Sequence, residues 1–133
     1  MKPQITGIHH VAIKAKGEAA FARLVSFYHD VLALPILREW DLADGGKGAM
    51  IDTGAGILEL FSNAPDERDA GALRHLALAV ADVDVCIEAV RAAGYVVTME
   101  PTVICIPSSP AFPARIAFCI GPVGEEVEFF CEK

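Results

Sequence analysis

The sequence predicts an α+β fold made of two copies of one strand–helix–three-strand module. The main observation is an internal repeat, in which GIHHVAI at 7–13 is echoed 65 residues later by ALRHLAL at 72–78. A second repeat pairs ILELF at 57–61 with EVEFF at 126–130. Between these segments, helical and strand periodicities follow one another in the same order in both halves. We therefore expect two equivalent modules within one domain.

The first half shows the periodicities of one helix and four strands. Apolar side chains recur at helical spacing after residue 17, and Leu34-Pro35 ends the helix because proline cannot continue its hydrogen-bond ladder. Glycine-containing turns separate the strands that follow. The expected strand, helix and three further strands lie at about 7–15, 17–33, 35–40, 48–53 and 56–61.

The second half repeats this order. Asp82 is suited to cap the start of a helix, and Gly94 stands where the C-cap is expected. The expected strand, helix and three further strands lie at about 73–80, 83–93, 95–99, 114–120 and 125–131. The single domain at 1–133 thus divides into a first module at about 5–62, a linker at 63–71 and a second module at about 72–132.

The stretch Pro101–Pro113 contains four of the eight prolines. Such a stretch is expected to be a rigid loop or an edge segment, since proline lacks the N–H that a central strand needs. It is a candidate lid or wall of a binding site, and the alternative is an ordinary long connection.

Strand alternation places one histidine and one glutamate of each module on a common face. Side chains alternate with period two, so the branched apolar residues of each strand point to the helix side. The polar residues then point to the second face of the sheet, and these are His10, Glu59, His75 and Glu128. His9 aligns with Arg74 and is expected to point to the helix side, which favours His10.

Two imidazoles and two carboxylates at equivalent positions of a repeat form the donor set of a divalent metal site. Taken singly, each residue has an ordinary explanation: a histidine in an apolar strand is usually structural, and a glutamate is usually solvent-facing. Two uncompensated carboxylates on a cleft floor would cost several kcal/mol. A dication removes that cost, so the sequence predicts metal ligation.

Composition excludes several functions. The net charge of −7 and the pI near 4.9 argue against nucleic acid or an anionic membrane surface as partner. No apolar stretch approaches the roughly 18–20 residues that cross a bilayer, and the N-terminus lacks the pattern of a secretory signal. The four cysteines are unclustered and are expected to be reduced thiols. A cytoplasmic protein is expected.

The chain resembles the vicinal oxygen chelate superfamily, which includes glyoxalase I, methylmalonyl-CoA epimerase, extradiol dioxygenases and the fosfomycin- and bleomycin-resistance proteins. The resemblance covers almost the whole chain. It implies paired βαβββ modules that form a curved mixed sheet around a metal-binding cleft. The segments that carry it are HHVAI at 9–13, FYHDVLAL at 27–34, GILELF at 56–61, LRHLALAV at 73–80, RIAF at 115–118 and GPVGEEVEFF at 121–130.

Within the superfamily the ligand set matches glyoxalase I, lactoylglutathione lyase, position for position. The resemblance implies a metal-dependent lyase or isomerase that converts a hemithioacetal through an enediolate, with Glu128 as the base and Glu59 as its counterpart. One divalent metal per site is implied, with Ni²⁺ or Co²⁺ favoured and Zn²⁺ possible. Lys14 and Asn63 occupy positions that contact glutathione in glyoxalase I. A homodimer is expected, and in some members the modules of different subunits complete each site.

Two other classes of function stay open. One is a related metalloenzyme, such as an epimerase, a dioxygenase or a thiol transferase, and the epimerases carry glutamine where this chain has Glu59. The other is a small-molecule binding or resistance protein. The segment Glu100–Pro113 contains no Lys or Arg, although glyoxalase I places basic contacts to glutathione in this region.

Overall fold

The computed structural model describes residue 4 and residues 8–67 and 75–133. The predicted linker at 63–71 and the start of the strand predicted at 73–80 fall partly outside these residues, so the module boundary stays a prediction. Within the described residues no helix is long and apolar enough to cross a membrane.

The two predicted βαβββ modules are confirmed, and each forms its own four-stranded mixed sheet. The strand orders are β1-β4-β3-β2 and β5-β8-β7-β6, and the pairs β1–β4 and β5–β8 are parallel. The first module contains β1 (His10–Lys14), α1 (Gly17–Ser26), η1 (Phe27–Val31), β2 (Ile36–Asp41), β3 (Lys47–Asp52) and β4 (Ile57–Phe61). The second contains β5 (Leu76–Ala79), α2 (Val83–Ala92), β6 (Val97–Ile106), β7 (Phe112–Ile120) and β8 (Glu126–Glu132).

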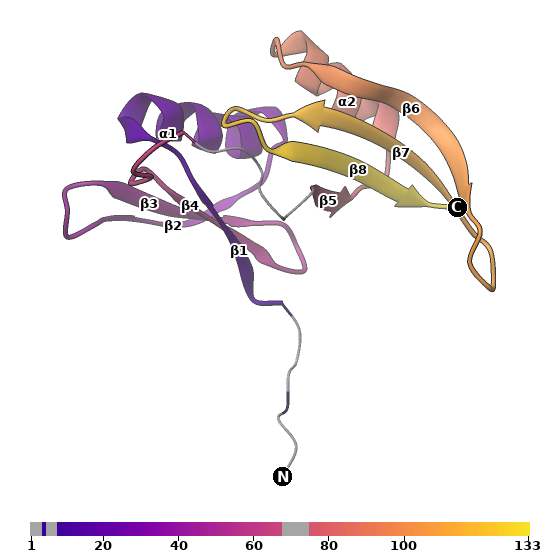
Figure 1. Cartoon of the computed structure of the whole chain (residues 1–133), viewed down its shortest axis with the longest axis horizontal. Coiled ribbons are helices and arrows are strands. Elements are labelled where there is room, and N and C mark those ends of the chain that lie inside the picture. Colours follow the sequence, from indigo (N-terminus) through magenta and orange to yellow (C-terminus); the bar gives the residue numbers. More distant parts are fainter. Residues whose placement is uncertain (1–3, 5–7, 68–74) are drawn as a thin grey trace.

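Each sheet is covered by its own helix. Helix α1 packs on β3 and β4, and α2 packs on β6, β7 and β8. The sheets lie beside each other along the long axis of the molecule (Figure 1). The side chains buried beneath the helices belong to the predicted apolar register, and they are Ala49, Ile51, Leu58 and Leu60 in the first module and Ala117, Cys119, Val127 and Phe129 in the second.

The two modules share one core. The ring of Phe27 meets that of Tyr95 edge-on with centroids 4.8 Å apart. The Tyr28 hydroxyl donates a hydrogen bond of 3.2 Å to Glu125 Oε2 in the turn between β7 and β8. Phe27 and Tyr28 are both fully buried, so the end of the first helix joins the modules.

The predicted first helix ends in a wider turn than its periodicity indicates. Residues Phe27–Val31 form a π-helical turn in which Leu32 N–H donates to Phe27 C=O at 3.1 Å. The wide turn places two sequence neighbours, Phe27 and Tyr28, in the core together, which a regular helix does less readily. Ala33 then adopts a positive φ of 59° and redirects the chain toward β2.

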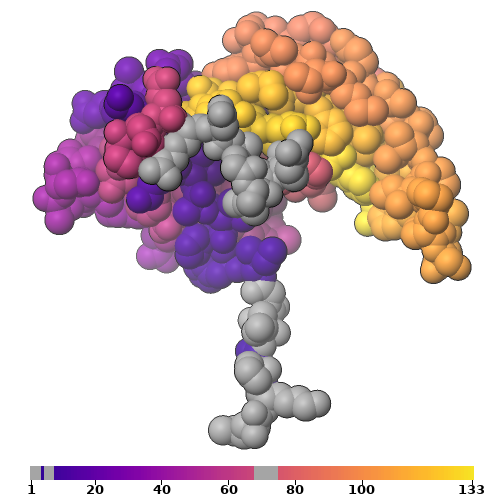
Figure 2. All heavy atoms as spheres, viewed as in Figure 1, coloured from indigo at the N-terminus to yellow at the C-terminus, as the bar shows by residue number. Residues whose placement is uncertain are grey.

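The stretch Pro101–Pro113 is largely a β-hairpin. Strand β6 continues to Ile106, beyond the end expected near residue 99, and only residues 107–111 connect it to β7. Pro101 is tolerated inside β6 because this strand lies at the edge of its sheet, where one row of N–H groups has no partner strand. In Figures 1 and 2 the hairpin projects from the second module (orange) and gives that side of the molecule an arched outline.

Candidate metal site

The first histidine–glutamate pair comes from two neighbouring strands. In the parallel register of β1 and β4, Ala12 is the partner of Glu59, so His10 lies one pleat away on the same face. His10 Nε2 is 3.4 Å from Glu59 Oε1. The other ring nitrogen, Nδ1, lies 2.9 Å from Nδ1 of His9, which leaves Nε2 directed at the carboxylate.

The second pair repeats this geometry in the second module. Ala77 of β5 is the partner of Glu128 on β8, and His75 precedes Ala77 by two residues. His75 Nε2 is 3.3 Å from Glu128 Oε1. The two modules therefore present the same two donor atoms at nearly the same separation.

The two carboxylates differ in burial. The side chain of Glu128 is 9% exposed and that of Glu59 is 16% exposed, whereas both imidazoles are about two-fifths exposed. Burial raises the pKa of Glu128, while the imidazole of His75 partly opposes the shift and Glu126 adds to it. A buried carboxylate facing an imidazole nitrogen is an environment that a dication stabilises.

Each pair fits half of a metal site. A neutral imidazole nitrogen and a carboxylate oxygen that face the same point are ligands suited to Ni²⁺, Co²⁺ or Zn²⁺. Among residues 8–67 and 75–133, however, no group of three or more possible ligands converges. The structure thus brings His10 to Glu59 and His75 to Glu128, and it does not bring the two pairs together within one chain.

Lys14 and Asn63 follow the predicted ligands of the first module, His10 and Glu59, by four residues each. Lys14 Nζ lies 5.9 Å from the centroid of the Phe61 ring. Asn63 Nδ2 donates to Asp44 Oδ2 at 3.3 Å. The N–H of Gly46, the amide of Asn63 and the charge of Lys14 together lower the pKa of Asp44. Both predicted substrate contacts form a polar end to this face, and neither touches the His10–Glu59 pair.

The sequence reasoning missed the aromatic side chains on the ligand faces. Phe61 and Phe130 follow the two glutamates by two residues, so strand alternation places each on the face of its glutamate. Phe118 is the register partner of Glu128, and Trp40 reaches Phe61 with centroids 6.0 Å apart. The same alternation that predicted the ligands would have predicted Phe61 and Phe130.

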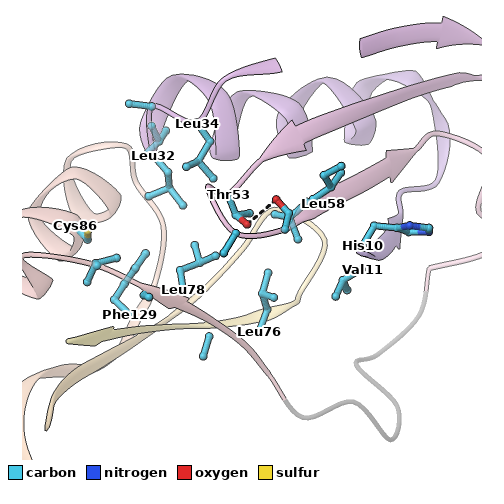
Figure 3. Close-up of a pocket in the computed structure, with 18 of the residues that line it drawn as sticks. His10, Val11, Leu32, Leu34, Thr53, Leu58, Leu76, Leu78, Cys86 and Phe129 are labelled. Atoms are coloured by element: carbon cyan, nitrogen blue, oxygen red, sulfur yellow. Dashed lines mark hydrogen bonds between the residues drawn. The ribbon is translucent and has the colours of Figure 1, made fainter. Parts of the chain in front are cut away.

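A cavity of about 540 Å³ lies between the modules. Its wall is mostly aliphatic and includes Val11, Leu58, Leu76 and Leu78, all in the apolar register. His10 stands at its rim with the imidazole pointing away from it (Figure 3). The cavity therefore adjoins the first pair through His10, whereas Glu59, His75 and Glu128 are not among the residues that line it.

Comparison with known proteins places this chain in a family. The family model of the Glyoxalase/Bleomycin resistance protein/Dioxygenase superfamily matches residues 7–129. The chain therefore belongs to this superfamily, as the sequence resemblance predicted.

Three relatives illustrate the range of similarity. The chain is 33% identical over 87 residues to the uncharacterized protein YaeR of Escherichia coli strain K12, a match that spans 60% of this chain and 65% of YaeR. The crystal structure of SMU.1112c superposes with a TM-score of 0.77 at 26% identity, covering 96% of this chain and 99% of that one. Glyoxalase I from Zea mays superposes with a TM-score of 0.74 at 25% identity, covering 92% of this chain but 43% of the maize protein.

Proposed function

We propose that this protein is a metal-dependent lyase or isomerase of the glyoxalase I type, acting on a small substrate with two adjacent oxygen atoms. The observation that carries the proposal is the duplicated pair of imidazole and carboxylate, His10 with Glu59 and His75 with Glu128, at 3.4 and 3.3 Å. Membership of the superfamily and the similarity to the maize enzyme support it.

The four ligands are proposed to meet between two copies of the chain. Each chain presents two half-sites that face away from their helices, and a symmetric dimer can pair the first module of one copy with the second module of the other. A homodimer would then contain two complete sites, each with two imidazoles and two carboxylates.

The chemistry proposed for the site is a proton transfer between neighbouring carbons. When bound, the metal would supply Lewis acidity at the substrate oxygens, which makes the adjacent C–H more acidic. Glu128 would take this proton and return it to the next carbon, since its buried carboxylate is more basic than an exposed one. Glu59, at the equivalent position of the repeat, would face the other side of the substrate.

The test begins with the metal. Purified protein is analysed by elemental mass spectrometry, stripped with a chelator and reconstituted with Ni²⁺, Co²⁺, Zn²⁺ and Mn²⁺, with Ni²⁺ or Co²⁺ expected to support the highest activity. Turnover of the hemithioacetal of methylglyoxal and glutathione is followed in the same series. One metal per chain with metal-dependent turnover supports the proposal, and metal without turnover points to another substrate in the same superfamily.

Glutamate variants separate catalysis from folding. Glu128→Gln and Glu59→Gln should each lower turnover far more than they lower the melting temperature, because both side chains lie on the ligand face and outside the core. Glu88→Gln, at an exposed position of α2, is the matched control and should leave turnover unchanged. If Glu59→Gln retains full activity, epimerase-type chemistry becomes the better explanation.

A further inference from the structure

Aromatic and aliphatic side chains surround Glu128 on the ligand face of the second sheet. Phe118 is its register partner on β7, and the Phe118 ring meets the imidazole of His75 edge-on with centroids 5.4 Å apart. Beyond them, Phe130 is the partner of Ile116 and lies 5.8 Å from the ring of Phe112. The surface next to this half-site is therefore apolar and largely aromatic.

This face carries no cationic side chain within residues 75–133. The cations in that range are Arg91, Arg115 and Lys133. Arg115 stands in the helix-side register and binds both carboxylate oxygens of Asp84, at 2.7 and 2.8 Å. Arg91 lies on α2 and pairs with Glu100. Odd-numbered residues of β7 and β8 point to the helix, and Lys133, directly after β8, continues this alternation. Like Arg115, it therefore points away from the ligand face.

The remaining charges on this face are carboxylates. Glu126 and Glu132 stand two residues before and four residues after Glu128 and share its register. A ligand carboxylate placed here would meet like charge and no compensating cation. Glutathione carries two carboxylates. In the described part of the second module, the ligand face has no cationic side chain to pair with either of them.

The first module offers one aromatic surface and two cations, Lys14 on β1 and Arg38 on β2, where Arg38 is the partner of Met50. The Trp40 indole lies flat against Gly48, where an added Cβ would come within 2.6 Å of the ring. Its edge-on neighbour Phe61 has Lys14 Nζ 5.9 Å from the ring centroid. Because position 48 has no side chain, the indole can lie on the ligand face there. Gly48 is two residues before Met50, which is the partner of Glu59.

We propose that the substrate bears an aromatic or bulky apolar group beside its two chelating oxygens, and that Phe118 and Trp40 select it. This inference rests on the proposed function, because it assigns a substrate class to the same site. Lys14 and Arg38 provide the cations for anionic groups on the first module, and the apolar group lies against Phe118 and Phe130 on the second. Stacking and burial of a ring on such a surface stabilise binding, whereas a charged peptide gains nothing there.

The test compares two ligands that chelate through the same atoms. Benzohydroxamate and acetohydroxamate bind metals through two adjacent oxygens and differ in carrying a phenyl or a methyl group. Trp40 is the single tryptophan, so its fluorescence reports binding, and calorimetry provides an independent affinity. Metal content is measured on the same samples, and S-methylglutathione is titrated in parallel.

Benzohydroxamate should bind the metal-loaded protein at least about tenfold more tightly than acetohydroxamate. Phe118→Ala should reduce this ratio to about threefold or less while acetohydroxamate affinity is retained. Phe118→Leu tests the same point with less loss of packing. Val103→Ala is the control, since Val103 is 59% exposed and pairs with Arg115 in the opposite register.

The outcomes separate the two proposals. Equal affinities for the two hydroxamates in metal-loaded wild-type protein, or tighter binding of S-methylglutathione, overturn the substrate class and leave the metal chemistry intact. Failure of the protein to take up any metal overturns the proposed function, and the substrate class is then lost with it.

Discussion

Mixing two defective chains tests whether the proposed metal site forms between two copies of the chain. One chain carries His10→Ala and the other carries His75→Ala. Each substitution removes the imidazole from one histidine–glutamate pair and leaves the other pair intact. Both histidines are about two-fifths exposed, so neither change should reduce the stability of the core.

The expected magnitude follows from counting half-sites. If sites form between copies, a heterodimer has one site that lacks both imidazoles and one site with all four ligands. It should therefore hold half the metal of the wild-type dimer. Each parent homodimer has two sites that lack one direct ligand, which should weaken metal binding by more than about 100-fold, since loss of even an outer-shell partner costs 10–100-fold. If sites form within one chain, the heterodimer contains no complete site.

The assay uses co-expressed chains with two different affinity tags. Sequential purification isolates the heterodimer, and elemental mass spectrometry gives the metal per dimer beside turnover. A heterodimer of wild-type and His29→Ala chains is the control, because His29 is exposed and contacts the carbonyl of Leu34. A heterodimer that is as empty as both parents, beside a fully loaded wild type, would refute the shared site.

Three further predictions concern stability and reactivity. Burial raises the pKa of Glu125 above its ordinary value of 4.5, so the folded state holds its proton more tightly than the unfolded state. Wild-type stability should therefore fall as the pH rises from about 4.5 through the raised value, and Glu125→Gln, which keeps an acceptor for Tyr28, should lack this fall in urea titrations across pH. Burial raises the pKa of Cys119 to about 12, so at about pH 8 a thiol reagent should modify the exposed Cys105 in the native protein and leave Cys119 unmodified, as mass spectrometry would show. Asp82→Ala should lower the free energy of unfolding by about 1 kcal/mol, because its carboxylate accepts the N–H groups of the first turn of α2.

Each of these has an outcome that contradicts it. Parallel pH profiles for wild type and Glu125→Gln would show that this carboxylate titrates normally in the folded state. Native modification of Cys119 at the rate of Cys105 would mean that the core beneath α2 opens readily. A loss from the exposed control Glu88→Ala equal to that from Asp82→Ala would remove capping as the cause.

The local sequence pattern determined the two modules and which side chains lie on each face of their sheets. Strand alternation has a period of two and each strand buries its branched residues, so His10 and Glu59, or His75 and Glu128, are expected to share a face, and the pairing registers agree. The same reasoning located the cap at Asp82 and the apolar register beneath the helices. These features depend on neighbours a few residues apart, and such neighbours are visible in the sequence.

The tertiary structure alone decided which groups meet. Whether two half-sites converge depends on how the modules dock, and that depends on contacts such as Phe27 with Tyr95, which lie 68 residues apart. Two other features also depend on long-range contacts. Helix docking favours the π-turn at Phe27–Val31 over a regular helix, and the edge position of β6 allows the strand to continue through Pro101. The burial that separates Glu128 from Glu59 likewise arises from long-range packing, which no periodicity along the chain records.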